Sequence, residues 1–169
     1  LVMLSAAGLE RLEKTESSSF SCDLRKWWDI MEAYENGGHA YHATMPTDSL
    51  RRFRDIMKET EEYGFEKVRA EQQELGDKVR EMLVAKGIKS VAGDGFQAPG
   101  VVVSYTDDKG IQTGKKFAEL GFQIAAGVPL QCDEPEDYQS FRLGLFGLDK
   151  LHNIGRTVEK LEKALAAIY

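Results

Sequence analysis

The longest regular pattern in the sequence is a run of apolar side chains at steps of three and four residues, which begins after Pro46 and continues past residue 80. This spacing places the apolar side chains on one face of an α-helix. Gly64 and Gly76 interrupt the run, and each glycine costs about 1 kcal/mol relative to alanine inside a helix. We therefore expect a bend or a break between helices at these glycines. The apolar positions are Leu50, Phe53, Met57, Val68, Leu75, Val79 and Met82.

From residue 100 onward, short apolar segments alternate with helical patterns. The segment after Pro99 and Gly100 is rich in valine, which favours a strand, and Thr113 is a suitable N-cap for a short helix. After Asp149 an apolar stripe recurs at helical spacing. These patterns predict an α+β fold in which helices cover one face of a three-stranded sheet. We expect strands at 101–105, 122–126 and 141–146, a helix from Thr113 to Leu120, and a last helix that begins at Asp149.

The first part of the chain is shorter and less regular. Its opening strip, Leu1 to Leu4, is typical of a buried strand with neighbours on both edges, which predicts further sequence before Leu1. We expect a turn of helix at Leu9 to Lys14 and a helix around Asp23 to Tyr34, which Gly37 and Gly38 would end. A polar and aromatic loop then leads to Pro46. We place a domain boundary there, between residues 1–46 and 47–169.

Composition excludes several classes of protein. The chain has 169 residues, 42% of them hydrophobic and 30% charged, as in an ordinary globular protein. Its net charge of -6 argues against a nucleic-acid partner, which requires a cluster of Lys and Arg. No apolar run is long enough to cross a membrane, and the first residues do not resemble a signal peptide. Cys22 and Cys132 suggest neither a disulfide framework nor a zinc site, so a reducing, cytoplasmic setting is expected.

Three apparent motifs carry little weight. The glycine spacing at 93–98 matches a dinucleotide-binding loop, but a proline and a valine-rich strand follow it where such a loop requires a helix. His39 and His42 lie beside no suitably spaced metal ligand, so we expect no metal site. Lys115 and Lys116 are expected on an exposed helical turn, where nothing would lower the lysine pKa as a catalytic role requires.

Arg142 is the strongest candidate binding residue. A guanidinium on a strand face needs an anionic partner, and the neighbouring Gly144 leaves room for a small ligand carboxylate to lie against the planar fork. A buried ion pair with an Asp or Glu of the scaffold explains the same pattern equally well. Alternation along the strand places Phe141, Leu143 and Leu145 on one face and Arg142, Gly144 and Phe146 on the other.

Three segments together resemble a known family. The loop Tyr41 to Pro46 (YHATMP) is similar to the Tyr-His-x-Thr-x-Pro loop of the alanine–glyoxylate and serine–glyoxylate aminotransferases. These enzymes form a class V branch of the fold-type I enzymes that depend on pyridoxal 5′-phosphate (PLP). The segment Phe141 to Gly147 (FRLGLFG) resembles their Arg-Ile-Gly-x-x-Gly strand, and Phe20 to Leu24 (FSCDL) resembles the start of the helix before the loop. The order and approximate spacing agree over the whole chain.

The resemblance implies roles for particular residues. Tyr41 and Thr44 would reach across a homodimer interface to the phosphate of the partner's PLP, and Arg142 would bind the α-carboxylate of the substrate. Gly127 would correspond to a glycine in the strand that leads to the substrate pocket. The family's Schiff-base lysine would lie upstream of Leu1, so the chain itself would contain no catalytic residue and would be inactive alone.

The resemblance also implies a reaction and an origin for the chain. Residues 1–46 would be the end of the large PLP-binding domain, and residues 47–169 would be the complete small C-terminal domain. The whole enzyme would transfer an amino group from a small amino acid, alanine or serine, to glyoxylate or another 2-oxo acid.

Two alternatives stay open. The first is another class V enzyme, such as a phosphoserine aminotransferase or a cysteine desulfurase. For a desulfurase, neither cysteine lies in a convincing nucleophile loop, and the acidic residues after Cys132 would raise the pKa of its thiol. The second is a stand-alone α+β binding module without a cofactor, in which the opening apolar strand would be an exposed edge.

Overall fold

The computed structural model describes residues 1–169, which form two compact units, Leu1–Arg54 and Asp55–Tyr169. The division lies inside helix α3 (Thr47–Tyr63), so this helix begins in the first unit and ends in the second. The domain boundary near Pro46, just before α3, stays a prediction. None of the helices combines the length and the apolar character that a membrane span requires.

The first unit contains two helices near the predicted places, although the first one begins three residues before the predicted turn at Leu9. Helix α1 (Ala6–Glu13) begins after Ser5, whose hydroxyl accepts a hydrogen bond from the amide of Gly8 at 3.2 Å. Helix α2 (Leu24–Glu35) begins after Asp23, whose carboxylate accepts from the amides of the first turn. Such caps satisfy amides that have no partner inside the helix. Gly37 follows α2 with a φ of +77°, a conformation that glycine adopts at little cost.

The predicted strand at Leu1 to Leu4 is wrong. These residues are irregular, and Leu1 and Met3 are 93% and 90% exposed. Their apolar character favours burial, but a strand also requires a neighbouring backbone that satisfies its amides and carbonyls. No segment of the chain pairs with residues 1–4.

The long helical pattern forms two helices, α3 and α4 (Phe65–Ala85). The predicted break occurs at Gly64, which has a φ of +99°. Gly76 does not interrupt α4, so the second expected break is wrong. A Cβ at Gly76 would lie 2.7 Å from the carbonyl oxygen of Pro99, so this glycine lets the chain before the first strand pass close to the helix. Arg80 of α4 donates to the carbonyls of Ala98 and Val101 in the same place.

The second unit contains the predicted three-stranded sheet, which is antiparallel with the order β1-β3-β2. Strand β1 (Val101–Tyr105) and strand β3 (Ser140–Gly144) pair along their whole lengths, with Val103 opposite Arg142. Strand β2 (Ala125–Ala126) is only two residues long, shorter than the predicted 122–126. Strand β3 ends at Gly144, two residues before the predicted end at Phe146.

The short helices differ in detail from the prediction. Helix α6 (Lys115–Glu119) lies within the expected helix from Thr113 to Leu120, and a helix that was not predicted, α5 (Lys109–Gln112), precedes it. Thr113 follows α5, and Gly114 takes the N-cap position of α6. Near the C-terminus, α7 (Leu148–Leu151) precedes α8 (Ile154–Ile168). Asn153 caps α8 by accepting from the amide of Arg156 at 2.9 Å, so Asp149 does not begin the last helix.

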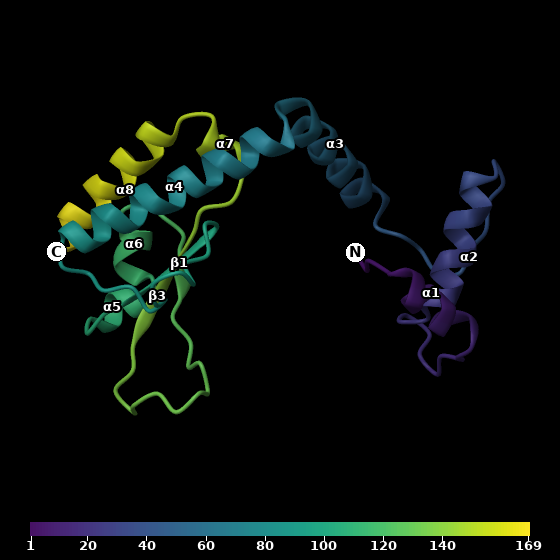
Figure 1. Ribbon diagram of the computed structural model, residues 1–169, viewed down its shortest axis with the longest axis horizontal. Helices are drawn as coiled ribbons and strands as arrows, with labels where there is room; N and C mark the ends of the chain where they lie inside the picture. The colour runs from purple at the N-terminus through teal and green to yellow at the C-terminus, as the bar shows by residue number, and fades with distance from the viewer. The chain divides into compact units, whose positions relative to one another are not determined.

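The hydrophobic core lies between the sheet and the helices. Within the second unit, α4 and α8 run side by side over one face of the sheet, as Figure 1 shows. Phe141 and Leu143 of β3 point into this core, whereas Arg142 lies on the opposite face. The core residues with the least exposed surface are Leu75, Val79, Leu83, Val102, Ile111, Phe117, Phe141 and Leu165.

Candidate functional site

Arg142 is held on the central strand of the sheet. Because β3 has a neighbour on both edges, its backbone is fixed by pairing with β1 and with β2. Burial alternates along the strand as the sequence predicted: Phe141, Leu143 and Leu145 are buried, whereas Gly144 and Phe146 are exposed. The guanidinium therefore lies on the sheet face that the core leaves uncovered.

The guanidinium of Arg142 uses only part of its capacity to donate hydrogen bonds. Its Nε donates to the carbonyl oxygen of Ala126 at 2.9 Å, which holds one edge of the fork. No carboxylate forms an ion pair with Arg142 in the chain. The terminal nitrogens therefore remain available to an outside acceptor. A planar guanidinium in this state matches the two oxygens of a carboxylate.

The absence of a side chain at Gly127 lets the backbone lie close enough to β3 for the Ala126 carbonyl to accept from Arg142. A Cβ at Gly127 would lie 1.7 Å from the carbonyl oxygen of Ser140, a separation that no side chain tolerates. The backbone after β2 therefore lies directly against β3, in line with the pairing of Ala126 and Phe141. The amide of Gly127 donates to the carbonyl of Gln112 at 3.2 Å, which ties the same point to α5. The sequence signalled Gly127 only through the family resemblance, and nothing in it signalled Ala126, because that contact is made by the backbone.

Open space adjoins Arg142 along the same strand face. The nearest atom to a Cβ built on Gly144 is Cδ2 of Phe146, at 3.9 Å. The Phe146 side chain is 62% exposed, and its ring lies against Gly100, where a Cβ would come within 2.4 Å of Cε1. Position 100 must therefore be a glycine to leave room for the ring. This face presents a guanidinium, a gap and an aromatic surface in succession.

In the first unit, Tyr41 and Thr44 lie together. The Tyr41 hydroxyl and Oγ1 of Thr44 are 3.2 Å apart, and either oxygen can donate to the other. Tyr41 is 76% exposed, so its hydroxyl is open to solvent. Two hydroxyls at this separation can donate to neighbouring oxygens of one phosphate group.

The loop that carries Tyr41 and Thr44 is anchored by His42. Nε2 of His42 is 2.8 Å from the carbonyl oxygen of Phe20. The imidazole also packs against the rings of Phe20 and Trp27, with centroid separations of 4.4 and 5.4 Å. His42 therefore holds the loop in place while Tyr41 stays exposed. The sequence analysis places His42 in the Tyr41 to Pro46 motif and excludes it as a metal ligand, but it assigns this residue no structural role.

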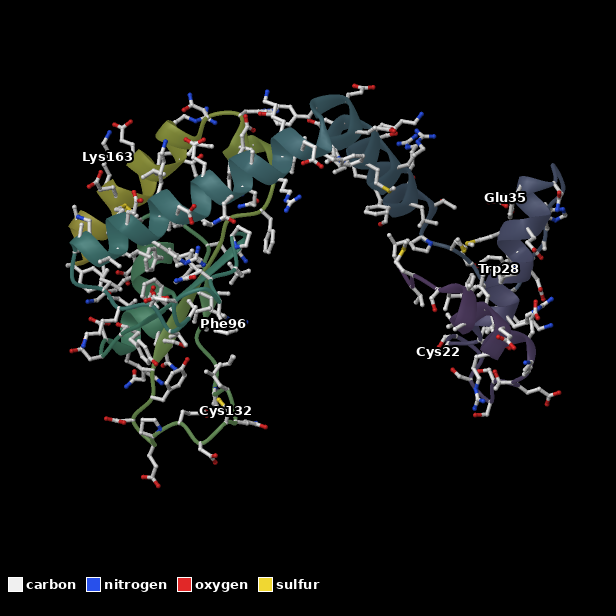
Figure 2. The ribbon with its side chains drawn as sticks, in the orientation of Figure 1. Cys22, Trp28, Glu35, Phe96, Cys132 and Lys163 are labelled. Carbon is white, nitrogen blue, oxygen red and sulfur yellow. The ribbon has the colours of Figure 1, made fainter.

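A hollow of about 670 Å³ borders the Tyr41 loop. A separate hollow of about 830 Å³ lies in the second unit. The lining of the hollow beside the Tyr41 loop is mainly apolar and includes Ile30 and Met31 of α2. Glu35, which projects from α2 in Figure 2, is the one charged residue of this lining. The loop therefore offers hydroxyl donors but no cation, so a bound phosphate would also need donors or positive charge from other chain segments.

The structure also places the other residues that the sequence analysis considered. Lys116 forms an ion pair with Asp108, which also caps α5 by accepting from the amide of Ile111 at 3.0 Å. The glycine-rich loop at 93–98 leads into β1, not into a helix. Cys22 and Cys132 are exposed thiols, and both are labelled in Figure 2.

Comparisons by sequence find no matching family model and no matching curated protein. Comparison of the fold finds similar solved structures. The structure of ureidoglycine–glyoxylate aminotransferase from Bacillus subtilis matches with a TM-score of 0.70 and 19% identity, over 95% of this chain and 40% of that one. An alanine–glyoxylate aminotransferase from Nostoc sp. matches with a TM-score of 0.70 and 17% identity, over 95% of this chain and 42% of that one.

A third match is an aspartate aminotransferase of subgroup IV from Thermus thermophilus, with a TM-score of 0.63 and 19% identity, over 98% of this chain and 44% of that one. The chain thus spans less than half the length of each of these proteins. At these identities the likeness establishes the fold alone. The chain has an α+β fold that matches part of each of these aminotransferases.

Proposed function

We propose that this chain is the C-terminal part of a PLP-dependent aminotransferase. The whole enzyme would transfer an amino group from a small amino acid, alanine or serine, to glyoxylate or another 2-oxo acid. In this proposal residues 47–169 form the small domain, and residues 1–46 complete the large, PLP-binding domain. The lysine that carries the cofactor belongs to the part of the enzyme before Leu1.

The observation that carries the proposal is the state of Arg142. The sequence left two explanations, a ligand carboxylate or a scaffold ion pair, and the guanidinium has no acidic partner in the chain. Its one hydrogen bond, to Ala126, fixes its orientation without neutralising its charge. The gap above Gly144 leaves room for the atoms that follow a carboxylate in an amino acid or a 2-oxo acid. Arg142 would thus bind and orient the substrate.

The pair of hydroxyls at Tyr41 and Thr44 supports the choice of cofactor. They are suited to donate to a phosphate ester, the group by which PLP is anchored. When bound, PLP would act as the electron sink that stabilises a carbanion at the substrate Cα. The residues of this chain would hold the phosphate and the carboxylate, so that the cofactor and the substrate keep a fixed orientation.

We extend the proposal to assembly and location. Tyr41 and Thr44 would serve the PLP of a partner subunit, so the enzyme would be a homodimer with two-fold symmetry. A cytoplasmic location agrees with the two unpaired cysteines.

Kinetics of Arg142 variants test the proposal in the whole enzyme. Arg142→Ala should lower kcat/KM, because it leaves the substrate carboxylate without a partner. The corresponding loss of transition-state stabilisation should be about 2–5 kcal/mol. Arg142→Lys should recover only part of this loss, since an ammonium lacks the planar fork. Arg156→Ala, which removes an exposed guanidinium at the start of α8, is the matched control and should leave kcat/KM unchanged. A lower melting temperature for Arg142→Ala, with kcat/KM within about threefold of the wild type, would instead indicate a scaffold role.

Reductive trapping with borohydride tests the position of the cofactor lysine. After incubation of this chain with PLP, we expect no stoichiometric label on any one lysine. Mass spectrometry of the digested protein identifies the labelled peptide, if there is one. A single stoichiometric label within residues 1–169, for example at Lys115, would contradict the proposal.

A further inference from the structure

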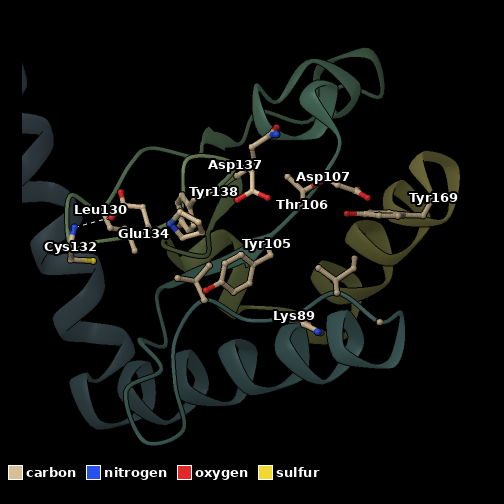
Figure 3. Close-up of a pocket in the computed structure, with 15 residues that line it drawn as sticks. Lys89, Tyr105, Thr106, Asp107, Leu130, Cys132, Glu134, Asp137, Tyr138 and Tyr169 are labelled. Atoms are coloured by element: carbon tan, nitrogen blue, oxygen red, sulfur yellow. Dashed lines mark hydrogen bonds between the residues drawn. The ribbon is translucent and has the colours of Figure 1, made fainter.

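A large hollow in the second unit has no lining residue in common with the Arg142 site or the Tyr41 loop. It has a volume of about 830 Å³, within the range of small-molecule sites. Figure 3 shows its lining, which comes from the end of β1, the loop between β2 and β3, the segment after α4, and Tyr169 at the end of the chain. No residue to which the proposed function assigns a role lines this hollow.

Two tyrosines form perpendicular walls of the hollow. The rings of Tyr105 and Tyr138 have centroids 5.7 Å apart and an interplanar angle of 82°. Tyr105 is 44% exposed, so much of its ring faces solvent. The Tyr138 hydroxyl is buried without a hydrogen-bond partner, so its ring is held by packing and not by its hydroxyl. Tyr169 adds a third ring, whose hydroxyl is directed toward Thr106 and Asp107 in Figure 3.

The charged side chains around these rings favour a cation. Three carboxylates, those of Asp107, Glu134 and Asp137, and a single ammonium, that of Lys89, line the hollow. Neither Asp107 nor Asp137 forms an ion pair, so no cation of the chain offsets either carboxylate. An anionic ligand would meet an excess of negative charge. A cation would be attracted both by the carboxylates and by the faces of the rings.

We propose that this hollow is a binding site for a small organic ammonium ion, which would sit in the corner between Tyr105 and Tyr138. Aromatic faces bind ammonium ions that carry alkyl groups, because the ring quadrupole attracts the charge while the alkyl groups pack against carbon. The unpaired carboxylates of Asp107 and Asp137 would add a longer-range attraction. This inference is independent of the proposed aminotransferase function, since it uses none of the same residues.

Titration of the whole chain with tetramethylammonium chloride tests the proposal, with sodium chloride as the control for ionic strength. Amide resonances in an NMR spectrum should shift in a saturable way around Tyr105 and Tyr138, and sodium should not reproduce the shifts. Tyr138→Leu removes one ring and should weaken binding at least about fivefold. Tyr138→Phe keeps the ring and should bind as the wild type does. Replacing both Asp107 and Asp137 by Asn should also weaken binding, because the attraction of charge is lost.

Two further variants keep the test decisive. Where Tyr138→Leu fails to fold, Tyr105→Leu removes the more exposed ring and should weaken binding similarly. Phe96→Leu changes an 86% exposed ring in the loop before β1, labelled in Figure 2, and should have no effect. Absence of saturable shifts with tetramethylammonium, or equal affinity of the wild type, Tyr138→Leu and Tyr105→Leu, would overturn the proposal.

Discussion

Gly127→Ala should weaken the second unit strongly. The new Cβ would lie 1.7 Å from the carbonyl oxygen and 2.4 Å from the carbonyl carbon of Ser140. Both atoms belong to the backbone of the central strand, so no side-chain rotation relieves the contact. An ordinary van der Waals contact requires a further separation of about 2 Å, which is more than the hydrogen bonds between β2 and β3 tolerate. We expect the chain after β2 to move away from β3.

The expected loss follows from these contacts. Overpacking of this kind costs about 1–3 kcal/mol. Separation of the strands would also break the hydrogen bond from Arg142 to Ala126, and bonds of this charged type contribute about 1.5–3 kcal/mol. We therefore expect the free energy of unfolding to fall by at least about 2 kcal/mol. Gly144→Ala is the matched control, because its Cβ meets no atom closer than 3.9 Å, and it should change stability by less than about 0.5 kcal/mol.

Urea unfolding followed by far-UV circular dichroism measures the helices of the whole chain, most of whose residues belong to the second unit. The only tryptophans, Trp27 and Trp28, lie in the first unit, so their fluorescence reports separately on that unit. Gly127→Ala should shift the dichroism transition to lower urea more than it shifts the fluorescence transition. If Gly127→Ala and Gly144→Ala unfolded at the same urea concentration, the close approach of residue 127 to β3 would be refuted.

Three more substitutions have expected outcomes. Tyr138→Phe should raise the free energy of unfolding by about 1–2 kcal/mol in urea titrations, because it removes a buried hydroxyl that has no partner; a lower value would mean that the hydroxyl is satisfied in solution. Glu134 accepts hydrogen bonds from the amides of Cys132 and Gln131, which lower its pKa from the usual 4.5 to about 2. Because the folded-state pKa is the lower one, this stabilisation is complete above 4.5 and is lost as the pH falls toward 2, so Glu134→Gln should flatten the dependence of the unfolding midpoint on pH in this range; an unchanged slope would exclude the contribution. Gly64→Ala should cost about 1–3 kcal/mol in thermal unfolding, because a φ of +99° strains any residue with a Cβ; an unchanged melting temperature would show that the backbone relaxes there.

Periodicity predicted the helices well, because burial of one face repeats locally along the chain. It found α2, the break at Gly64 and the stripe of α8. It failed at Gly76. The sequence does not distinguish a glycine that ends a helix from a glycine that lets a backbone carbonyl, here that of Pro99, pack closely against the helix. It also failed at Leu1 to Leu4, where apolar residues alone could not reveal that no strand of this chain pairs with them.

The candidate site could be predicted only where it depends on alternation along one strand. Arg142 and Gly144 share a face because neighbouring side chains on a strand point to opposite sides. The bond from Arg142 to Ala126 depends on the strand order, in which β3 lies between strands that precede it in sequence. The corner formed by Tyr105 and Tyr138 is likewise a contact between distant segments. No local pattern marks either contact.

The two edges of the sheet bear on the solubility of the second unit. Beyond β1, the amide of Val91 donates to Val103 at 3.0 Å, and the amide of Tyr105 donates to Lys89 at 2.9 Å, so this edge is already covered. On the other side, β2 is only two residues long. Long unpaired edges are what allow sheets of different molecules to join into aggregates. With one edge covered and the other very short, the second unit should resist aggregation through strand pairing even at high protein concentration.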